Sequence, residues 1–455
     1  MSWRRARSAL VVRWDGCAGR RRSRAAFAIG CSRPLAALAI VVTFAAGLAA
    51  DARALASTDA PAVASAGGEG ITLGDRLDRQ LVADVAGGRA RVQLSGLFDL
   101  EGYYIDQRPP GLIFGGDDSF ANPRLSLFLD TRVGRSWYLF VEARADRGFD
   151  PREDSASFRF DQYFLRWTPL AAGVLDLQVG KFATVVGNWV ARHDSWTNPL
   201  INAPLPYENV TTASDVKAAP SASAFLDRRR IPDKKREWVP LVWGPAYTSG
   251  AAVFARHGAT DVALEVKNAS LSSRPKEWDA RARGFAYPTV EGRIGWRPSA
   301  AWTLGASLSG GTYLDDDGDT TGVGFRVGSH HETVAAVDAA YSWRHLQLWA
   351  ETFVGRFEIP RVGNADTVAY YVEGRYQLTP RLFAALRWNQ QFFGDIENDH
   401  GHDRTWDQDA WRVDTAIGCR LNRHVQAKLQ YSYKHQRGDL QQGEQLVAAQ
   451  LTLKF

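Results

Sequence analysis

A long alternation of apolar and polar residues constrains the fold of this chain more than any other feature. It begins near residue 90 and continues to the C-terminus. In residues 425–434, VQAKLQYSYK, every odd-numbered residue is apolar or aromatic, and every even-numbered residue is Gln, Ser or Lys. A period of two is typical of β-strands with one apolar and one polar face. Because helical periodicity is nearly absent, we expect an all-β fold.

The connections between these segments alternate in length. Sixteen segments start near residues 90, 122, 137, 157, 173, 248, 260, 287, 301, 332, 346, 366, 381, 408, 424 and 444. Short connections lie at 134–136, 169–173, 257–260, 297–300, 344–345, 379–380 and 422–423. Longer polar ones lie near 106–121, 148–156, 183–247, 268–286, 314–331, 358–365, 394–407 and 437–443. This pattern predicts a transmembrane, antiparallel, up-and-down β-barrel of about 16 strands, residues 90–455, with short periplasmic turns and longer extracellular loops. A sandwich or propeller gives no reason for it.

The physics of a bilayer favours the same prediction. Unpaired backbone groups in hydrocarbon cost several kcal/mol each, and a closed barrel leaves no unpaired edge. The mean hydropathy of −0.28 is then expected, since only alternate strand residues face lipid. Six aromatic residues beside short turns lie on the apolar face, as a membrane-interface belt requires. They are Trp137, Trp167, Trp296, Trp302, Trp343 and Tyr376.

The N-terminal region accounts for the basic pI of about 9.1. Residues 1–56 hold ten Arg and two Asp, so the rest of the chain has 45 basic and 48 acidic residues and a net charge of −3. We therefore expect no nucleic-acid partner. An Arg-rich start, an apolar run over 34–50 and Ala54-Leu55-Ala56 predict a cleaved secretory signal peptide over residues 1–56. Residues 57–89 would form a periplasmic N-terminal extension, with a short helix predicted within 71–85.

Cysteine use agrees with export. Cys17 and Cys31 fall within the predicted signal peptide, and only Cys419 remains after cleavage. The mature chain can then form no internal disulfide.

The C-terminal residues LTLKF, 451–455, resemble the C-terminal signal of Gram-negative outer-membrane porins, an alternating strand that ends in Phe. The whole of residues 90–455, with a long loop after the fifth strand, is similar to that family. The resemblance implies a water-filled channel for passive diffusion of small hydrophilic solutes, and assembly as a homotrimer. It also implies contact with outer-membrane lipids and lipopolysaccharide, and recognition of Phe455 by the barrel-assembly machinery.

A second, shorter match concerns selectivity. Residues 179–190, VGKFATVVGNWV, resemble a Gly-Lys-Phe segment of phosphate-selective O/P-type porins, which implies a preference for phosphate. This chain has Val185-Val186 where that family has a Pro-containing continuation.

The loop over residues 183–247 is too long for a plain connection, and in porins such a loop folds into the lumen and narrows the pore. It holds the densest basic cluster outside the predicted signal peptide: Arg228, Arg229, Arg230, Lys234, Lys235 and Arg236. Basic rings in a pore favour anions. The alternative is a solvated charge run at the cell surface that binds lipopolysaccharide phosphates. Strand positions expected to line the lumen carry acidic residues as well as Arg132, Arg144, Arg166, Arg293, Arg375, Arg412, Lys428 and Lys434.

Other chemistry has less support in the sequence. His193-Asp194-Ser195 has the residue types of a hydrolase triad, but three consecutive side chains cannot converge on one reacting atom. Residues 315–319, DDDGD, could bind calcium but lack the spacing of an EF-hand, so a solvated turn is the favoured interpretation. We predict no enzyme activity, cofactor or metal site. The alternative functions are a barrel for secretion or polysaccharide export and, less favoured, a barrel enzyme.

The first testable prediction concerns export. The mature protein should begin at Ser57, because Ala54-Leu55-Ala56 follows an apolar core of the length that signal peptides have. The intact mass of the membrane-extracted protein measures this directly. A mass that includes residues 34–50 would contradict cleavage.

Overall fold

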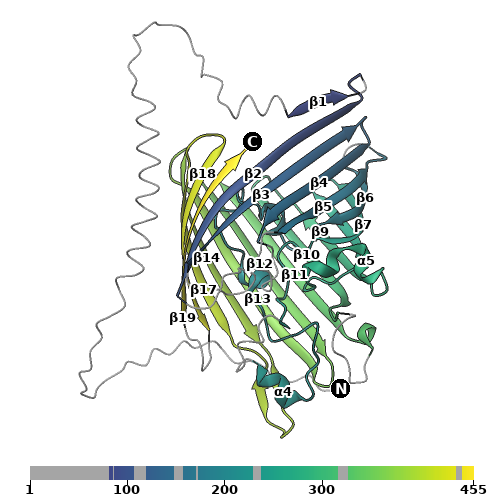
Figure 1. Ribbon diagram of the computed structural model, residues 1–455, viewed down its shortest axis with the longest axis vertical. Coiled ribbons are helices and arrows are strands. Elements are labelled where there is room, and N and C mark those ends of the chain that lie inside the picture. Colours follow the sequence, from purple (N-terminus) through teal and green to yellow (C-terminus); the bar gives the residue numbers. More distant parts are fainter. Residues whose placement is uncertain are drawn as a thin grey trace, which may run out of the picture. The chain divides into compact units, whose positions relative to one another are not determined.

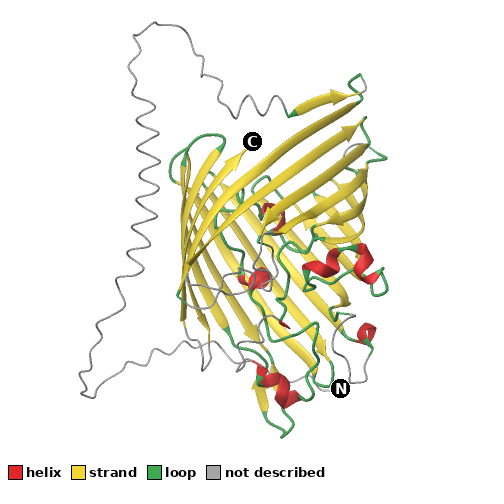
Figure 2. Cartoon of the chain, in the orientation of Figure 1, coloured by secondary structure: helices red, strands yellow, loops and turns green. Residues whose placement is uncertain are grey.

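The computed structural model describes residues 81–85, 87–106, 119–147, 157–170, 173–228, 237–315, 326–436 and 443–455. The predicted signal peptide and residues 57–80 lie outside the described residues, so their predictions stay open. Most of the regular structure is strand (Figure 2). Within the described ranges, no helix is both long and apolar enough to cross a membrane.

Sixteen antiparallel strands close into a barrel (Figure 1), as predicted. Their bounds are β2 Ala90–Ile105, β3 Ser119–Val133, β4 Trp137–Asp146, β5 Ser157–Trp167, β6 Leu175–Phe182, β7 Thr248–His257, β8 Thr260–Lys267, β9 Thr289–Trp296, β10 Trp302–Thr312, β11 His331–Trp343, β12 Leu346–Ile359, β13 Gly363–Gln377, β14 Leu382–Phe393, β17 Ala410–Arg420, β18 Val425–Gln436 and β19 Gly443–Lys454. Each pairs with the next along the chain, and β19 pairs with β2 to close the ring. The strands start within three residues of the predicted positions.

Short helices and one hairpin occupy the longer connections. The helices are η1 Val190–Arg192, α3 Leu205–Glu208, α4 Ala222–Leu226, η4 Pro275–Trp278, α5 Ala280–Arg283 and η5 Val327–Ser329. The hairpin joins β15 Asp395–Glu397 to β16 Asp403–Thr405. The C-terminus lies near one end of the barrel and α4 near the other (Figure 1).

One predicted loop, 358–365, is wrong. β12 ends at Ile359 and β13 begins at Gly363, so only residues 360–362 form the turn. The polar composition misled the prediction, because polar cross-strand pairs continue the two strands. Arg356 and Asp366 are such a pair, with Nε and Oδ1 2.6 Å apart.

The helix predicted within 71–85 is also wrong where it can be seen. Val82–Val85 form a strand, β1, that pairs with the start of β2 from Ala90 to Gln93. The reason is a free edge, since β19 ends opposite Leu97 and leaves the first residues of β2 without a neighbour on that side. Backbone donors and acceptors at such an edge are satisfied by an added strand.

The barrel has its apolar residues outside and its polar residues inside, the reverse of a soluble protein. Leu308 is 58% exposed and Leu386 56%, whereas Glu291 and Glu373 are 1% and 0% exposed. Such an outer surface is stable only in contact with lipid.

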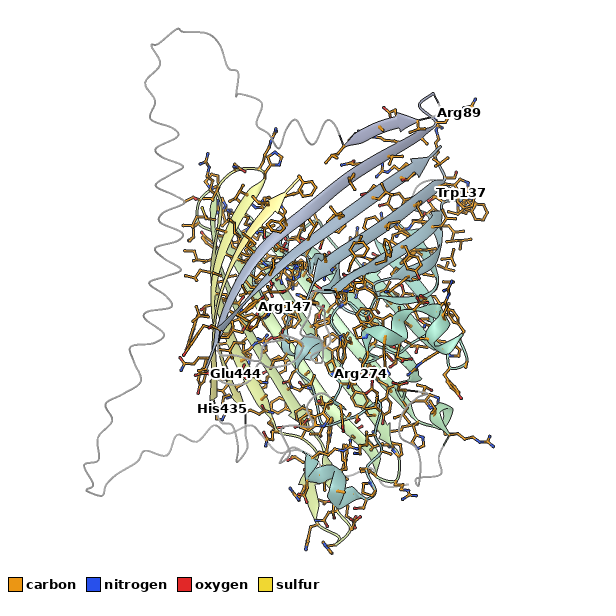
Figure 3. All side chains as sticks on the ribbon, viewed as in Figure 1. Arg89, Trp137, Arg147, Arg274, His435 and Glu444 are labelled. Atoms are coloured by element: carbon orange, nitrogen blue, oxygen red, sulfur yellow. The ribbon has the colours of Figure 1, made fainter. Side chains whose placement is uncertain are left out.

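The predicted aromatic belt lies on this outer surface. All six aromatic side chains beside short turns are between 40% and 54% exposed. Trp137 projects from the outer surface (Figure 3) and stacks on Trp167 of the neighbouring strand, with ring centroids 5.8 Å apart. Half-exposed amphipathic rings at strand ends are suited to the interface between lipid and water.

The C-terminal Phe455 completes the closure of the barrel. Its backbone exchanges two hydrogen bonds with Gly96 of β2, at 2.8 and 3.1 Å. Its ring covers Gly96 so closely that a Cβ at that position would overlap the ring. Both the backbone and the ring of Phe455 therefore hold the last strand against the first.

We predict that deletion of Phe455, or Gly96→Val, lowers the yield of folded barrel several-fold, because each removes the seating of β19 on β2. Heat-modifiable migration on a gel reports the folded fraction. Gly102→Val on the same strand is the control, because a Cβ there meets no atom. An unchanged folded fraction in both test variants would exclude this role.

Candidate pore constriction

Between β6 and β7, the described residues 183–228 and 237–247 fold back against the inner side of the barrel wall. Its apolar side chains join inward-facing side chains of the wall in one buried cluster. Tyr207 of the loop packs edge-on against Phe353 of β12, with ring centroids 5.5 Å apart. Together they fill the side of the lumen next to β10–β14. The loop is therefore a folded element with its own core and not a flexible strap.

Glu351 of β12 holds the start of this loop. Its carboxylate accepts hydrogen bonds from the backbone N–H groups of Asn188 and Trp189 and, at 2.7 Å, from the Tyr207 hydroxyl. Gly187 is needed beside it, since its φ is +79° and a Cβ would collide with the Tyr207 hydroxyl. The three donors satisfy the hydrogen-bonding capacity of a buried carboxylate that has no access to water.

A chain of buried charges links the loop to the opposite part of the wall. Arg192 of η1 pairs with Glu373 of β13 at 2.5 Å, and Glu373 also pairs with Arg387 of β14 at 3.1 Å. Arg387 continues to Asp414 of β17 at 2.9 Å and donates to the backbone and side-chain oxygens of Asn202 in the loop.

The chain of charges ends at a second loop residue. Arg412 of β17 pairs with Asp414 at 2.9 Å and with Glu208 of α3, and it donates to the carbonyl of Ala203. Because the cations and carboxylates alternate, the chain is neutral. Removal of one member would leave a buried charge unpaired, which costs about 3–5 kcal/mol.

The two predicted lumen lysines also anchor the loop. Lys428 of β18 donates to the carbonyls of Ser195, Asn198 and Leu200 at 2.9 to 3.2 Å. Lys434 of the same strand donates to the side chain of Asn209 at 2.8 Å. Both ammonium groups are buried.

Most of the predicted lumen arginines face inward but are engaged by protein groups. Arg144 pairs with Asp161, Arg166 donates to Gln178, Arg293 pairs with Asp338, and Arg375 donates to Gln377. Arg132 is exposed near the end of β3. The sequence located these side chains on the polar face but did not indicate their partners. It also missed Glu351 and Arg387, whose inward positions follow from the alternation.

The space left open lies on the other side of the lumen. A cavity of about 140 Å³ separates the loop from the inner faces of β2, β3, β4 and β19. Asp99, Glu101 and Arg124 line it from the wall, and Asp194 and Glu208 from the loop. Arg147, at the end of β4, also lines it (Figure 3). Since each water in the liquid takes up roughly 30 Å³, the cavity holds about five waters.

Only one residue of the predicted basic cluster is described. Arg228 follows α4 and donates to the carbonyls of Thr212 and Lys217, at 3.0 and 2.6 Å, beside the ring of Phe225. It does not line the cavity. Arg229, Arg230, Lys234, Lys235 and Arg236 lie outside the described residues.

The structure separates the three residues of the hydrolase-like sequence. The His193 ring donates from Nδ1 to the Val190 carbonyl at 2.6 Å, so Nε2 accepts from the Tyr247 hydroxyl. Burial lowers the pKa of His193, which favours this neutral ring. Asp194 instead accepts from the backbone N–H groups of Trp196 and Thr197, both at 2.8 Å. No nucleophile and base are brought together here.

The predicted calcium segment begins at a residue that is already engaged. Asp315 is buried and pairs with Lys276, and its N–H donates to the Asp215 carbonyl at 2.9 Å. Residues 316–319 lie outside the described residues. Among the described residues, no group of three or more His, Cys, Asp or Glu side chains could hold a metal ion.

Comparisons with known proteins identify the fold. No family model matches the chain, and no curated protein is similar in sequence. Solved structures do match. An anion-selective porin from Comamonas acidovorans has a TM-score of 0.52 at 9% identity, over 80% of this chain and 100% of that one. The outer membrane channel DcaP of Acinetobacter baumannii has a TM-score of 0.51 at 12% identity, over 80% and 97%. Salmonella typhi OmpF, in a complex with daunomycin, has a TM-score of 0.50 at 11% identity, over 82% and 100%.

These similarities show that the chain has the fold of outer-membrane porins and channels. At such low identity they show the architecture and not the solute.

We predict that Glu351→Ala loosens the loop, because it removes the acceptor of three buried hydrogen bonds. Hydrogen bonds to a charged group contribute about 1.5–3 kcal/mol each. Single-channel recordings should show a conductance at least about twofold higher and noisier than that of the parent. Glu358→Ala, at a partly exposed position near the end of the same strand, should leave conductance unchanged. Equal conductance in the two variants would exclude Glu351 as an anchor.

Proposed function

We propose that the protein forms a narrow water-filled channel for passive diffusion of small hydrophilic solutes across the outer membrane. The observation that carries this proposal is the off-centre cavity, bounded by polar side chains of the wall on one side and by the folded loop on the other. The apolar outer surface and the porin-like fold support a location in the outer membrane. The loop fills so much of the lumen that the channel would select solutes by their size and by their contacts with the residues that line the cavity.

The charges around the cavity favour weak ion selectivity. Five carboxylates line the cavity, against three guanidinium groups. The carboxylates belong to Asp99, Glu101, Asp146, Asp194 and Glu208, and the guanidinium groups to Arg124, Arg144 and Arg147. A preference for anions or phosphate would then depend on the basic cluster of residues 228–236. The position of Arg228, bound to backbone carbonyls away from the cavity, weakens that preference.

The remaining parts of the proposal concern biogenesis and partners. The chain would be exported with a cleaved signal peptide, inserted by the barrel-assembly machinery that reads Phe455, and surrounded by lipid and lipopolysaccharide, in a homotrimer. The alternative of secretion or polysaccharide export has less support, because a cavity of about 140 Å³ is too small for a polymer to pass. The separation of His193, Asp194 and Ser195 gives no support to a barrel enzyme.

The experiment is a recording of the purified protein in a planar bilayer. We expect discrete conductance steps, and under a salt gradient a reversal potential near zero. Replacing Arg228, Arg229, Arg230, Lys234, Lys235 and Arg236 by Gln should move this potential toward cation preference only if the cluster lies in the pore. The screening length at physiological salt is about 8 Å, so a cluster at the cell surface should have little effect. A folded protein without conductance steps would overturn the channel proposal.

A further inference from the structure

We propose that the cavity between the loop and β2, β3 and β19 binds one class of transported solute, a neutral polyhydroxylated ring such as a monosaccharide. This inference rests on the proposed channel function and adds the chemistry of what passes. It depends on three observations, which concern the unpaired polar groups of the lining, its aromatic rings and its charges.

The amides of two lining residues are held in one orientation by Glu101. Its carboxylate accepts from Asn122 Nδ2 at 3.2 Å and from Gln450 Nε2 at 2.6 Å. The two amide oxygens therefore point away from this carboxylate, and they are buried without a hydrogen-bond partner in the described part of the chain. An unpaired buried acceptor costs about 1–3 kcal/mol, which a donor from a ligand or water would recover.

The loop contributes two further unpaired groups to the same lining. The Ser195 hydroxyl and the Trp189 indole N–H are also buried without a partner among the described residues. The residues that line the cavity therefore carry two acceptors, one donor and one hydroxyl that have no hydrogen-bond partner among the described residues. A hydroxyl group both donates and accepts, so a ligand with several hydroxyls matches this set.

Aromatic rings form one side of the cavity. Tyr103 and Phe120 stack with centroids 4.9 Å apart and planes 17° from parallel, and both line the cavity. The Tyr103 hydroxyl donates to Glu101 at 2.9 Å, so the ring is fixed in place. A flat apolar surface beside polar groups suits a sugar ring, whose C–H face is apolar and whose hydroxyls project from the edge.

The charged lining residues are occupied by protein partners, which favours a neutral solute over an ion. Arg124 donates to Asp99 at 3.1 Å and also pairs with Glu101, and Thr452 donates to Asp99 at 2.5 Å. Glu208 pairs with Arg412. Three other charged residues of the lining also have protein partners. Asp146 pairs with Arg159, Asp194 accepts from the backbone of Trp196, and Arg144 pairs with Asp161. Among the described residues of the lining, Arg147 at the edge of the cavity is the position where a charge on the solute would matter, and the test includes it.

The test uses D-glucose, D-glucosamine and D-glucuronate, which share a ring and differ in charge. Each is added to single channels in a planar bilayer, and the concentration that halves the ion current is measured. Glucose should reduce the current in a saturable manner, and at least about threefold more strongly than either charged sugar.

Variants test the residues. Asn122→Ala and Gln450→Ala should each raise the half-blocking concentration of glucose by roughly fivefold, the value of one lost hydrogen bond. Phe120→Leu, which stays apolar but loses the ring face, should also raise the half-blocking concentration. Gln445→Ala, on the exposed face of the same strand as Gln450, is the matched control and should not change it.

The outcomes separate this inference from the channel proposal. Conductance steps that glucose does not reduce would overturn the inference and leave the channel intact. Stronger block by glucuronate that Arg147→Gln abolishes would also overturn it, in favour of an anionic solute. A folded protein with no conductance would overturn the channel proposal and, with it, the route for any solute. Heat-modifiable migration confirms that each variant is folded.

Discussion

The hydrogen bonds between β19 and β2 close the sheet on itself, and the rest of the structure depends on that closure. A ring of sixteen strands satisfies its backbone internally, so its outer surface can be apolar and its interior polar. The same closure fixes which alternate residue of every strand faces the lumen. Because Phe455 and Gly96 complete the ring, the last residue of the chain supports a wall that begins more than 350 residues earlier.

A polar interior creates the next requirement, which the long loop meets. Several charged side chains face the lumen and are buried, so each needs partners other than water. They are Glu351, Glu373, Arg387, Arg412 and Lys428. The loop supplies them through backbone groups and through Arg192 and Glu208, while the two wall arginines alternate with carboxylates. The loop and wall therefore stabilise each other, and the open space is confined to the side of β2, β3, β4 and β19.

The fold could be predicted from sequence because a period of two and alternating connection lengths are local properties. The strand starts follow from them, and so do the inward positions of Arg144, Lys428 and Lys434. Partner choice could not be predicted in the same way. Whether Lys428 faces water or binds three carbonyls depends on where residues more than 200 positions away fold. Residues 82–85 differ from the helix predicted within 71–85 for a similar reason, since the free edge of β2 is a property of the closed sheet and not of that segment.

The unequal length of the strands has a consequence for the surrounding lipid. β6, β8 and β9 have eight residues each, whereas β12 and β13 have 14 and 15. At about 3.3 Å per residue and a tilt of about 40°, eight residues span roughly 20 Å, less than the apolar band of about 25 Å that such barrels present. Acyl chains beside the short strands have to compress by about 5 Å, at a cost of fractions of a kcal/mol per ångström. The hydrophobic mismatch is therefore one-sided, and it favours a thin membrane or a neighbouring protein surface along that side of the barrel.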